Sequence, residues 1–424
     1  MMKRRLKKSR RILQLLIFFL LCSGCGTPSD PPSIGRACER EPQGERPAAT
    51  ASNQCRIRYA KGFDVSYHDG CKIVTVFEPG QAPGSKGTAT FVLVPRGTRR
   101  SLPVEPARGA VIEIPVRRVV LRSASHAPFF SMLGLADRIV GITQGKYVND
   151  PEVSDLIRRG LIAEVGVGSG MTSQFDMERL FSLRPDLVLS WWTNNPAYAA
   201  HIKAQEAGLP IALLSDYEES SPLGRAEWVK FVAAFFDAEA AAERVFDDVE
   251  RRYLAMAAKT RGVHLQPTVL YGSSYQGSWY IAGGKSYFAN LVRDAGGLYV
   301  WADDNSTGSR PVNVETAMFR GRNADYWFTQ NQNHFSLASV AAEDSRYRLF
   351  RSFQAERVYS NNGKIGPGGG NDYYQATVAR PDLLLADMIA ILHPELLPGH
   401  KLIWHLHLPP NMPDGTDGFR ARGK

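Results

Sequence analysis

Apolar and polar positions alternate along this chain in two different patterns. Between residues 59 and 116, short apolar runs (CKIVTVFE, TATFVLVP and AVIEIPV) are separated by segments rich in Gly and Pro, which is typical of a small β-meander. From Arg117 onward, strand-like runs such as RVVLRS and RIVGIT alternate with helical segments such as HAPFFSMLGLAD. Because alternating strands and helices form βα units, the sequence predicts an α/β fold with parallel sheets behind an N-terminal β extension.

A long amphipathic segment divides the βα series into two. Its apolar residues follow the i, i+3, i+4, i+7 spacing of a helix, at Ala242, Val245, Phe246, Val249, Tyr253 and Met256. At 1.5 Å per residue, about 24 helical residues would reach roughly 36 Å, which is long enough to join two lobes. We therefore expect a β extension over 59–116, an N-lobe over 117–236, an interlobe helix over 237–262 and a C-lobe with a closing helix over 263–410.

The N-terminus has the features of an export signal. Seven basic residues precede the apolar run Ile12–Cys22, which is shorter than the about 20 residues that span a bilayer. The following Ser-Gly-Cys resembles a bacterial lipobox, although Cys22 stands where Leu is usual. We expect a lipoprotein signal peptide over 1–24, a lipid on Cys25, a flexible tether over 25–58 and a flexible tail over 411–424. Secretory cleavage near Cys25 without a lipid is the alternative.

Composition and charge narrow the range of partners. A chain of 424 residues suits two lobes better than one small core. The net charge of +9 falls to +2 once the seven basic residues before Ile12 are removed, because 44 basic residues then face 42 acidic ones. No basic stripe with interleaved aromatic residues remains, so we expect no nucleic-acid partner.

The cysteines fit an oxidising compartment. Cys22 would leave with the signal peptide, and Cys25 would carry the lipid. Cys38, Cys55 and Cys71 remain, so one pair could form a disulfide and leave one free thiol, with the pairing open. No Cys/His ligand spacing is present, so no metal site is expected.

Two motifs that suggest catalysis are incomplete. GGKS at 283–286 would need a Gly at position 279 to form a phosphate-binding loop, and Trp279 stands there. SASHAP contains Ser123, Ser125 and His126, but the chain has no G-x-S-x-G nucleophile elbow. We therefore expect no enzyme activity. An envelope enzyme of unknown reaction and a surface adhesion or structural lipoprotein are the alternatives.

Two helix–strand units carry a glutamate at matching places. Glu178 opens the helix in FDMERLFSLRPDLVLSWW, and Glu315 opens the helix in VNVETAMFRGRNADYWFT. A glutamate in a first helical turn complements the helix dipole, which by itself is common. Its repetition in both halves of the chain indicates a shared role.

The order of these motifs resembles the helical-backbone (class III) periplasmic substrate-binding proteins of ABC importers, an iron-siderophore, haem and cobalamin-binding family. The resemblance covers Arg117–Leu408 and is carried by VVLRSASHAPFFSMLGLADRIVGIT, DMERLFSLRPDLVLSW, YIAGGKSYFANLVRDAGG, VNVETAMFRGRNADYWF and RPDLLLADMIAILHPE. It implies a monomeric, lipid-anchored protein of the bacterial cell envelope, facing the periplasm or the cell exterior, without a cofactor. It also implies that Glu178 and Glu315 dock on arginines of the ABC permease subunits, one from each lobe.

Ligand contacts are expected at the strand ends, because ligands of open α/β sheets gather at the carboxyl ends of strands. An aromatic cleft with few charges favours a bulky metal chelate of the iron-siderophore type, with haem or cobalamin as the alternative. Trp327 lies inside its strand and is expected in the core. The expected ligand-binding residues are Ser125, His126, Lys146, Trp191, Trp192, Tyr275, Trp279, Trp301, Arg310, Tyr373 and Tyr374.

Overall fold

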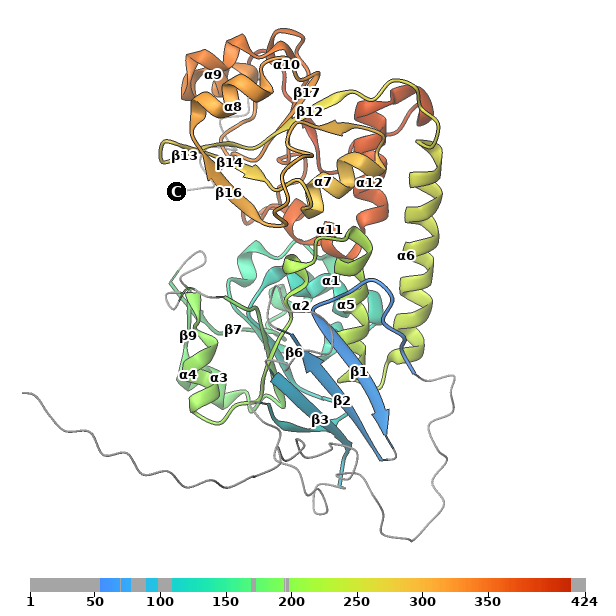
Figure 1. The fold of residues 1–424 in the computed structure, drawn as a ribbon. Helices are drawn as coiled ribbons and strands as arrows, with labels where there is room; N and C mark the ends of the chain where they lie inside the picture. Colours follow the sequence, from blue (N-terminus) through green and yellow to red (C-terminus); the bar gives the residue numbers. More distant parts are fainter. Residues whose placement is uncertain are drawn as a thin grey trace, which may run out of the picture.

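Two α/β lobes stand side by side along one long helix, α6 (Glu239–Lys259), in the computed structural model of the protein (Figure 1). The structure describes residues 54–68, 70–77, 89–97, 109–168, 173–193, 195 and 198–412. The predicted signal peptide, Cys25 and the tail after 412 lie outside these residues. The two-lobed α/β prediction is confirmed, and α6 lies within the predicted range of the interlobe helix.

The N-lobe is built on a fully parallel sheet with the strand order β11-β10-β5-β6-β7. Its central strands are fully buried and apolar except for Ser190 at the end of β10, as expected where helices cover both sides of a sheet. The strands are β5 (Val119–Leu121), β6 (Ile139–Ile142), β7 (Ala163–Glu164), β10 (Leu187–Ser190) and β11 (Ile211–Leu213), with a separate pair β8 (Gly166–Val167) and β9 (Gln174–Phe175). The helices are α1 (Ala127–Leu133), α2 (Pro151–Arg158), α3 (Met177–Ser182), α4 (His201–Glu206) and α5 (Pro222–Ala234).

The C-lobe repeats this plan with the order β15-β12-β17-β18-β19, in which only the edge strand β19 is antiparallel. The strands are β12 (Thr268–Tyr271), β15 (Leu298–Tyr299), β17 (Tyr326–Thr329), β18 (Val358–Ser360) and β19 (Leu406–His407). An antiparallel ribbon, which the sequence pattern did not predict, adds β13 (Ser273–Tyr275), β14 (Ser278–Ala282) and β16 (Ser309–Val312). The helices are α7 (Tyr287–Asp294), α8 (Val314–Gly321), α9 (Leu337–Glu343), α10 (Arg351–Gln354), α11 (Ala376–Ala379) and α12 (Pro381–Leu392).

Local sequence sets where these helices begin and end. Side chains of Asp150, Asp176 and Asn313 accept a backbone N–H in the first turns of α2, α3 and α8. Gly134 ends α1 in the left-handed conformation, at φ 67°. Short 3-10 turns lie at η4 (Ala124–His126), η5 (Ala136–Arg138), η6 (Gly145–Tyr147), η9 (Asp216–Glu218), η10 (Ser345–Leu349), η11 (Asp372–Tyr374) and η12 (Pro394–Leu396).

The N-terminal extension forms a four-stranded sheet in the order β1-β2-β3-β4. Its strands are β1 (Phe63–His68), β2 (Cys71–Val76), β3 (Ala89–Pro95) and β4 (Val111–Ile114), and β4 pairs with β3 in parallel rather than as a meander. The sheet packs on α5, where the ring of Phe63 lies 4.7 Å from that of Trp228. Cys71 is disulfide-bonded and Cys55 is a buried free thiol, so these two are not the bonded pair; Cys38 lies outside the described residues.

Residues 55–62, which we call the strap, lie across α5 and α6 just before β1. The carboxylate of Glu227, fully buried on α5, accepts the backbone N–H groups of Arg58, Tyr59 and Ala60 at 2.6–3.0 Å. The equally buried Lys230 donates to Arg56 O at 2.6 Å and pairs with Glu227 at 3.0 Å. The fold therefore begins before residue 59, where the sequence pattern placed the end of the tether.

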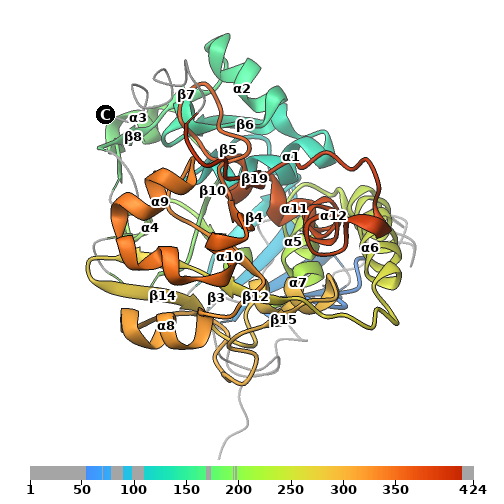
Figure 2. The same cartoon turned by 90° about the horizontal axis from the view of Figure 1, so that it is seen from above.

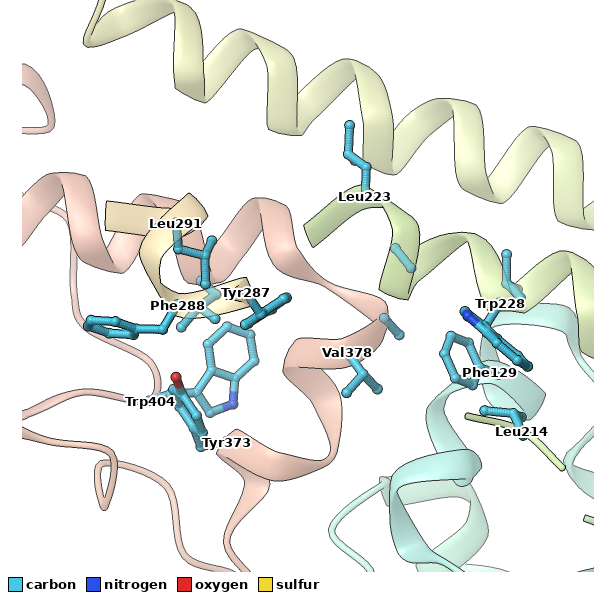
Figure 3. Packing of buried hydrophobic residues seen from close by; sticks show 14 of the residues in the cluster. Phe129, Leu214, Leu223, Trp228, Tyr287, Phe288, Leu291, Tyr373, Val378 and Trp404 are labelled. Atoms are coloured by element: carbon cyan, nitrogen blue, oxygen red, sulfur yellow. The ribbon is translucent and has the colours of Figure 1, made fainter. Parts of the chain in front are cut away.

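The lobes share one apolar core along the helices α5, α6, α7 and α12, which gather on one side of the molecule (Figure 2). Figure 3 shows Val378 between aromatic residues of the C-lobe, such as Tyr287 and Trp404, and Phe129 and Trp228 of the N-lobe. A core that continues across both lobes limits how far they can move apart. In the part of the chain that the structure describes, no helix combines the length and the hydropathy of a membrane span.

Candidate functional site

Loops that follow parallel strands of the two lobes meet at the junction between the lobes. The backbone N–H of Asn149, in the loop after β6, donates to Gln375 Oε1 at 2.9 Å, and its side-chain amide donates to Gly370 O at 2.9 Å. Gln375 and Gly370 belong to the segment after β18. Loops that follow strands of the two sheets are thus in direct contact, as expected for a ligand site between two lobes.

Arg122 is the main charged residue at the N-lobe strand ends. It follows β5 directly, and its side chain is buried, with 6% exposure. The guanidinium carbon lies 4.5 Å from the centroid of the Trp191 ring, and Nη2 donates to Ser173 O at 3.4 Å. Burial lowers the pKa of Arg122 to about 10. Among the described residues, no carboxylate pairs with this guanidinium and Nη1 has no hydrogen-bond acceptor.

Two histidines lie in the field of this cation. Burial and then the charge of Arg122 lower the pKa of His126 to about 3 and that of His201 to about 4, so both rings are neutral near pH 7. Within the described part of the chain, Nδ1 of each ring lacks a hydrogen-bond partner, as do the hydroxyls of Ser173 and Ser190. His126, which we expected to face the cleft, is buried beside Arg122.

Aromatic side chains form the N-lobe part of the site. Trp191 follows β10, and its ring lies edge to face with Tyr217 at 6.5 Å and tilted against Tyr198 at 6.4 Å. The Tyr217 hydroxyl donates to Trp192 O, and Trp192 N–H donates to Ser215 Oγ at 3.3 Å. Trp191 and Trp192 are half-buried at a strand end, as expected. Tyr217 and Arg122 were not predicted.

Amide and hydroxyl groups dominate the C-lobe part. Asn361 follows β18, and its Nδ2 donates to the hydroxyl of Tyr374 at 2.8 Å. Asn361 Oδ1 and Ser360 Oγ have no partner among the described residues. Tyr374 is 45% exposed and Tyr275 is 64% exposed, whereas Tyr373 is buried between Tyr374 and His405. Tyr373 is thus a core residue rather than the accessible contact we expected.

Two predicted tryptophans belong to the C-lobe core. Trp279 is fully buried, donates from Nε1 to Tyr271 O at 3.0 Å and packs against Trp327 at 5.6 Å. Trp301 is buried against Tyr299. Their prediction as ligand contacts is corrected because β14 turns Trp279 toward the sheet, and the loop after β15 folds Trp301 inward. Trp327 is in the core, as predicted.

The remaining predicted contacts already have partners. Arg310 pairs with Asp304 at 2.6 Å, which neutralises it on the antiparallel ribbon and removes the reason for its prediction. Lys146 Nζ lies 4.7 Å from the ring centroid of Tyr147, at the contact between the lobes. Ser125 Oγ is hydrogen-bonded to Ser123 Oγ at 2.7 Å beside Arg122.

A cavity of about 350 Å³ lies beside Asn149, between α1, α2, α6 and the segment 364–380. Its cations are already paired: Arg252 and Arg380 with Asp382 at 2.9 Å, and Lys364 with Asp372 at 2.9 Å. A cation that is already in an ion pair attracts an anionic ligand only weakly. This cavity is therefore a weaker candidate for the site than the strand ends around Arg122.

Glu178 and Glu315 occupy equivalent places in the two lobes. Each lies in the first turn of a helix, α3 or α8, which leads into the strand beside the first strand of its sheet. Both helices lie on the side of the molecule away from α6 (Figures 1 and 2). Both side chains are exposed, and Glu315 forms an exposed ion pair with Arg346 at 3.1 Å.

Comparisons with known proteins agree with this geometry. A family model described as "Periplasmic binding protein" matches residues 119–361. An uncharacterized lipoprotein of Methanocaldococcus jannaschii is 28% identical over 318 residues, which cover 72% of each chain, and a second one is 26% identical over 358 residues, covering 81% of this chain and 84% of that protein.

Two solved structures share the fold. A possible iron-binding (periplasmic solute-binding) protein from Staphylococcus epidermidis has a TM-score of 0.53 at 16% identity, covering 66% of this chain and 99% of that protein. A Helicobacter pylori protein solved with Ni(II) bound has a TM-score of 0.51 at 18% identity, covering 69% and 88% of the two chains. The β extension precedes the matched family region.

Proposed function

This chain belongs to the periplasmic binding protein family, and we propose that it captures a metal chelate of the iron-siderophore type between its lobes and delivers it to an ABC permease. In this proposal the protein performs no chemistry. A lipid on Cys25 holds it in the cell envelope, and Glu178 and Glu315 dock it on the permease.

The observation that carries the proposal is that the two lobes present two unlike sets of side chains after their strands. Trp191 and Tyr217 offer aromatic faces in the N-lobe, while Asn361 and Tyr374 offer hydrogen-bonding groups in the C-lobe. A chelate has both kinds of surface, with apolar rings or chains on its outside and oxygen atoms around the metal. The iron-binding and nickel-bound proteins of the same fold support this ligand class.

An apolar contact of modest size is sufficient for useful affinity. At ~25 cal/mol per Å², covering about 200 Å² of apolar ligand surface contributes roughly 5 kcal/mol before ordering costs. Hydrogen bonds and charge interactions add to this, so binding at about micromolar Kd is within reach. The shared core between the lobes leads us to expect little change in overall shape on binding.

The aromatic group also suits a flat macrocycle, so haem and cobalamin are the second candidates. Titration of the purified protein with ferric siderophores, haem and cobalamin, followed by intrinsic Trp fluorescence, distinguishes them. We expect saturable quenching by one of the three and its loss when Trp191 and Trp192 are both replaced with Ala. Trp301→Phe, a change in the buried core, is the matched control and should keep the response. Binding of a sugar or amino acid with no response to any chelate would overturn the proposal.

A further inference from the structure

The Arg122 side chain is a buried cation without a counter-ion among the described residues. It is one of two buried guanidinium or ammonium groups of the described chain: the other, Lys230, pairs with Glu227 and Glu243. Arg122 has one weak hydrogen bond, to Ser173 O at 3.4 Å, and one aromatic neighbour, Trp191. Contact with an aromatic face attracts a cation but does not neutralise it. A charge buried in this way is costly, and its retention indicates a partner that arrives from outside.

Several polar groups around Arg122 also lack partners among the described residues. Nδ1 of His126 and of His201, and the hydroxyls of Ser173 and Ser190, are buried without hydrogen-bond partners in the described chain. They come from η4, α4, the segment before β9 and the end of β10. The charge of Arg122 acts on both histidines, its Nη2 donates to Ser173 O, and its backbone N–H donates to Leu189 O, next to Ser190, so separate elements converge on one place. Neutral imidazole and hydroxyl groups can each donate one hydrogen bond. Buried polar groups normally have partners, so a cluster of unpaired ones around a cation is a site rather than ordinary core.

We propose that Arg122 is the receptor for an anionic oxygen group of the ligand, a carboxylate or a phosphate, and that the ring of Trp191 covers this receptor until the ligand moves it aside. The guanidinium supplies paired N–H donors that match either group in a bidentate arrangement. The histidines and serines complete the donor set without adding charge. The inference rests on the proposed function only for the larger molecule to which the anion belongs.

Simple anions test the receptor without knowledge of that molecule. The purified protein is titrated with sodium phosphate and with sodium citrate against sodium chloride at constant ionic strength, and both Tm and Trp fluorescence are recorded. We expect a saturable rise in Tm with phosphate or citrate but not with chloride, because an anion that binds only the folded state stabilises it. The oxyanion with the lower half-saturation concentration identifies the preferred group.

Arg122→Met separates a receptor from a structural residue. Because the variant removes a buried charge that has no counter-ion in the described part of the chain, its Tm in chloride should be higher than that of the unchanged protein. Oxyanions should raise the Tm of the variant no further. Arg244→Met, which removes an exposed arginine of α6, should leave the oxyanion response unchanged. Trp191→Phe should keep the rise in Tm and lose the fluorescence change. A fall in Tm for Arg122→Met in chloride, or an undiminished oxyanion response, would overturn the inference.

The chelate titration distinguishes failure of this inference from failure of the proposed function. If a chelate binds the unchanged protein and Arg122→Met equally well, the function stands and the receptor is wrong. If oxyanions act through Arg122 while no chelate binds, the receptor stands and the ligand class of the proposed function is wrong.

Discussion

Gln375 of the C-lobe is hydrogen-bonded to two backbone groups of one N-lobe loop. Its Oε1 accepts the N–H of Asn149 at 2.9 Å, and its Nε2 donates to Tyr147 O at 2.8 Å. Glycines beside it allow the two backbones to touch: a Cβ on Gly368 would lie 1.7 Å from Lys146 O, and one on Gly370 would lie 2.0 Å from Tyr147 O. The lobes are therefore joined by main-chain contacts as well as by the core at α5, α6 and α12.

Gly368→Ala tests this contact between the backbones. The added methyl group cannot be accommodated beside Lys146 O, because a carbonyl of the main chain has no freedom to rotate away. We expect the lobes to separate locally and the free energy of unfolding to fall by about 2 kcal/mol or more. Denaturant unfolding measures the change, and small-angle scattering measures the separation. Gly308→Ala, where a Cβ has no heavy atom within 4 Å, is the control and should be close to neutral.

Replacement of both Glu178 and Glu315 with Ala should slow uptake while ligand affinity stays the same. Exposed ion pairs contribute only about 0.2–1 kcal/mol each, so the effect should appear mainly in the rate of association with the permease. For the same reason, the existing pair of Glu315 with Arg346 is weak enough to be exchanged for a permease arginine. Glu152→Ala, another exposed glutamate in a first helical turn, is the matched control. A large loss of ligand affinity in the double variant would place these residues in the binding site instead.

Cys25→Ala should release the protein from the membrane fraction, because the apolar run before it is too short to span a bilayer. Cell fractionation followed by detection of the protein gives the readout. Cys22→Leu restores the usual lipobox residue and should keep the protein membrane-bound. Retention of the Cys25→Ala variant in the membrane fraction would contradict the anchor.

Asp216→Asn should change how stability depends on pH. Burial raises the pKa of Asp216 to about 7 from 3.8, although Arg225 opposes the shift. Between these values the folded state holds a proton that the unfolded state has lost, so the contribution of Asp216 to stability falls as pH rises from about 4 to 7. Asparagine has no proton to lose. Relative to the unchanged protein, the free energy of unfolding of the variant should therefore rise between pH 4 and 7. The rise is at most about 4 kcal/mol for a pKa shift of about 3 units.

Denaturant unfolding at pH 4, 6 and 8 measures this difference. His126 and His201 have lowered pKa values and act in the opposite direction, adding stability as pH rises toward 6.5. They are present in both proteins, so their effect cancels when variant and unchanged protein are compared at the same pH. A difference that stays constant from pH 4 to pH 8 would contradict a raised pKa at Asp216.

The long-range plan of the fold could be predicted from the sequence because its signals are long and periodic. The spacing from Ala242 to Met256 gives α6, and the alternation of apolar runs with helices gives the parallel sheets. Short strands, and the burial of a helix on both of its sides, could not be predicted. The antiparallel ribbon is built from strands of three to five residues. Glu227 and Lys230 look like surface residues of α5, and only the strap that covers them explains their burial.

Some residues of the candidate site could also be located from the sequence, and others could not. Trp191 and Trp192 directly follow β10 and Tyr374 follows the Gly-rich loop, and each keeps part of its surface exposed. Trp279 and Trp301 have a similar sequence context, but an aromatic residue near a strand end can point to either side, and packing decides. Arg122 was missed because an arginine at the end of an apolar run looks like a solvated strand end. What distinguishes it is the lack of a counter-ion among the described residues, which only three-dimensional structure reveals.

The strap determines how mechanical load would enter the molecule. A pull on the N-terminal segment reaches the fold at Arg56–Ala60, where one carboxylate of α5 holds three successive N–H groups and Lys230 holds a carbonyl. Tension is thus passed to the pair of helices α5 and α6 and shared by both lobes. The strand ends lie off this load path. Force applied to the N-terminal segment should therefore leave the distance between Trp191 and Asn361 unchanged.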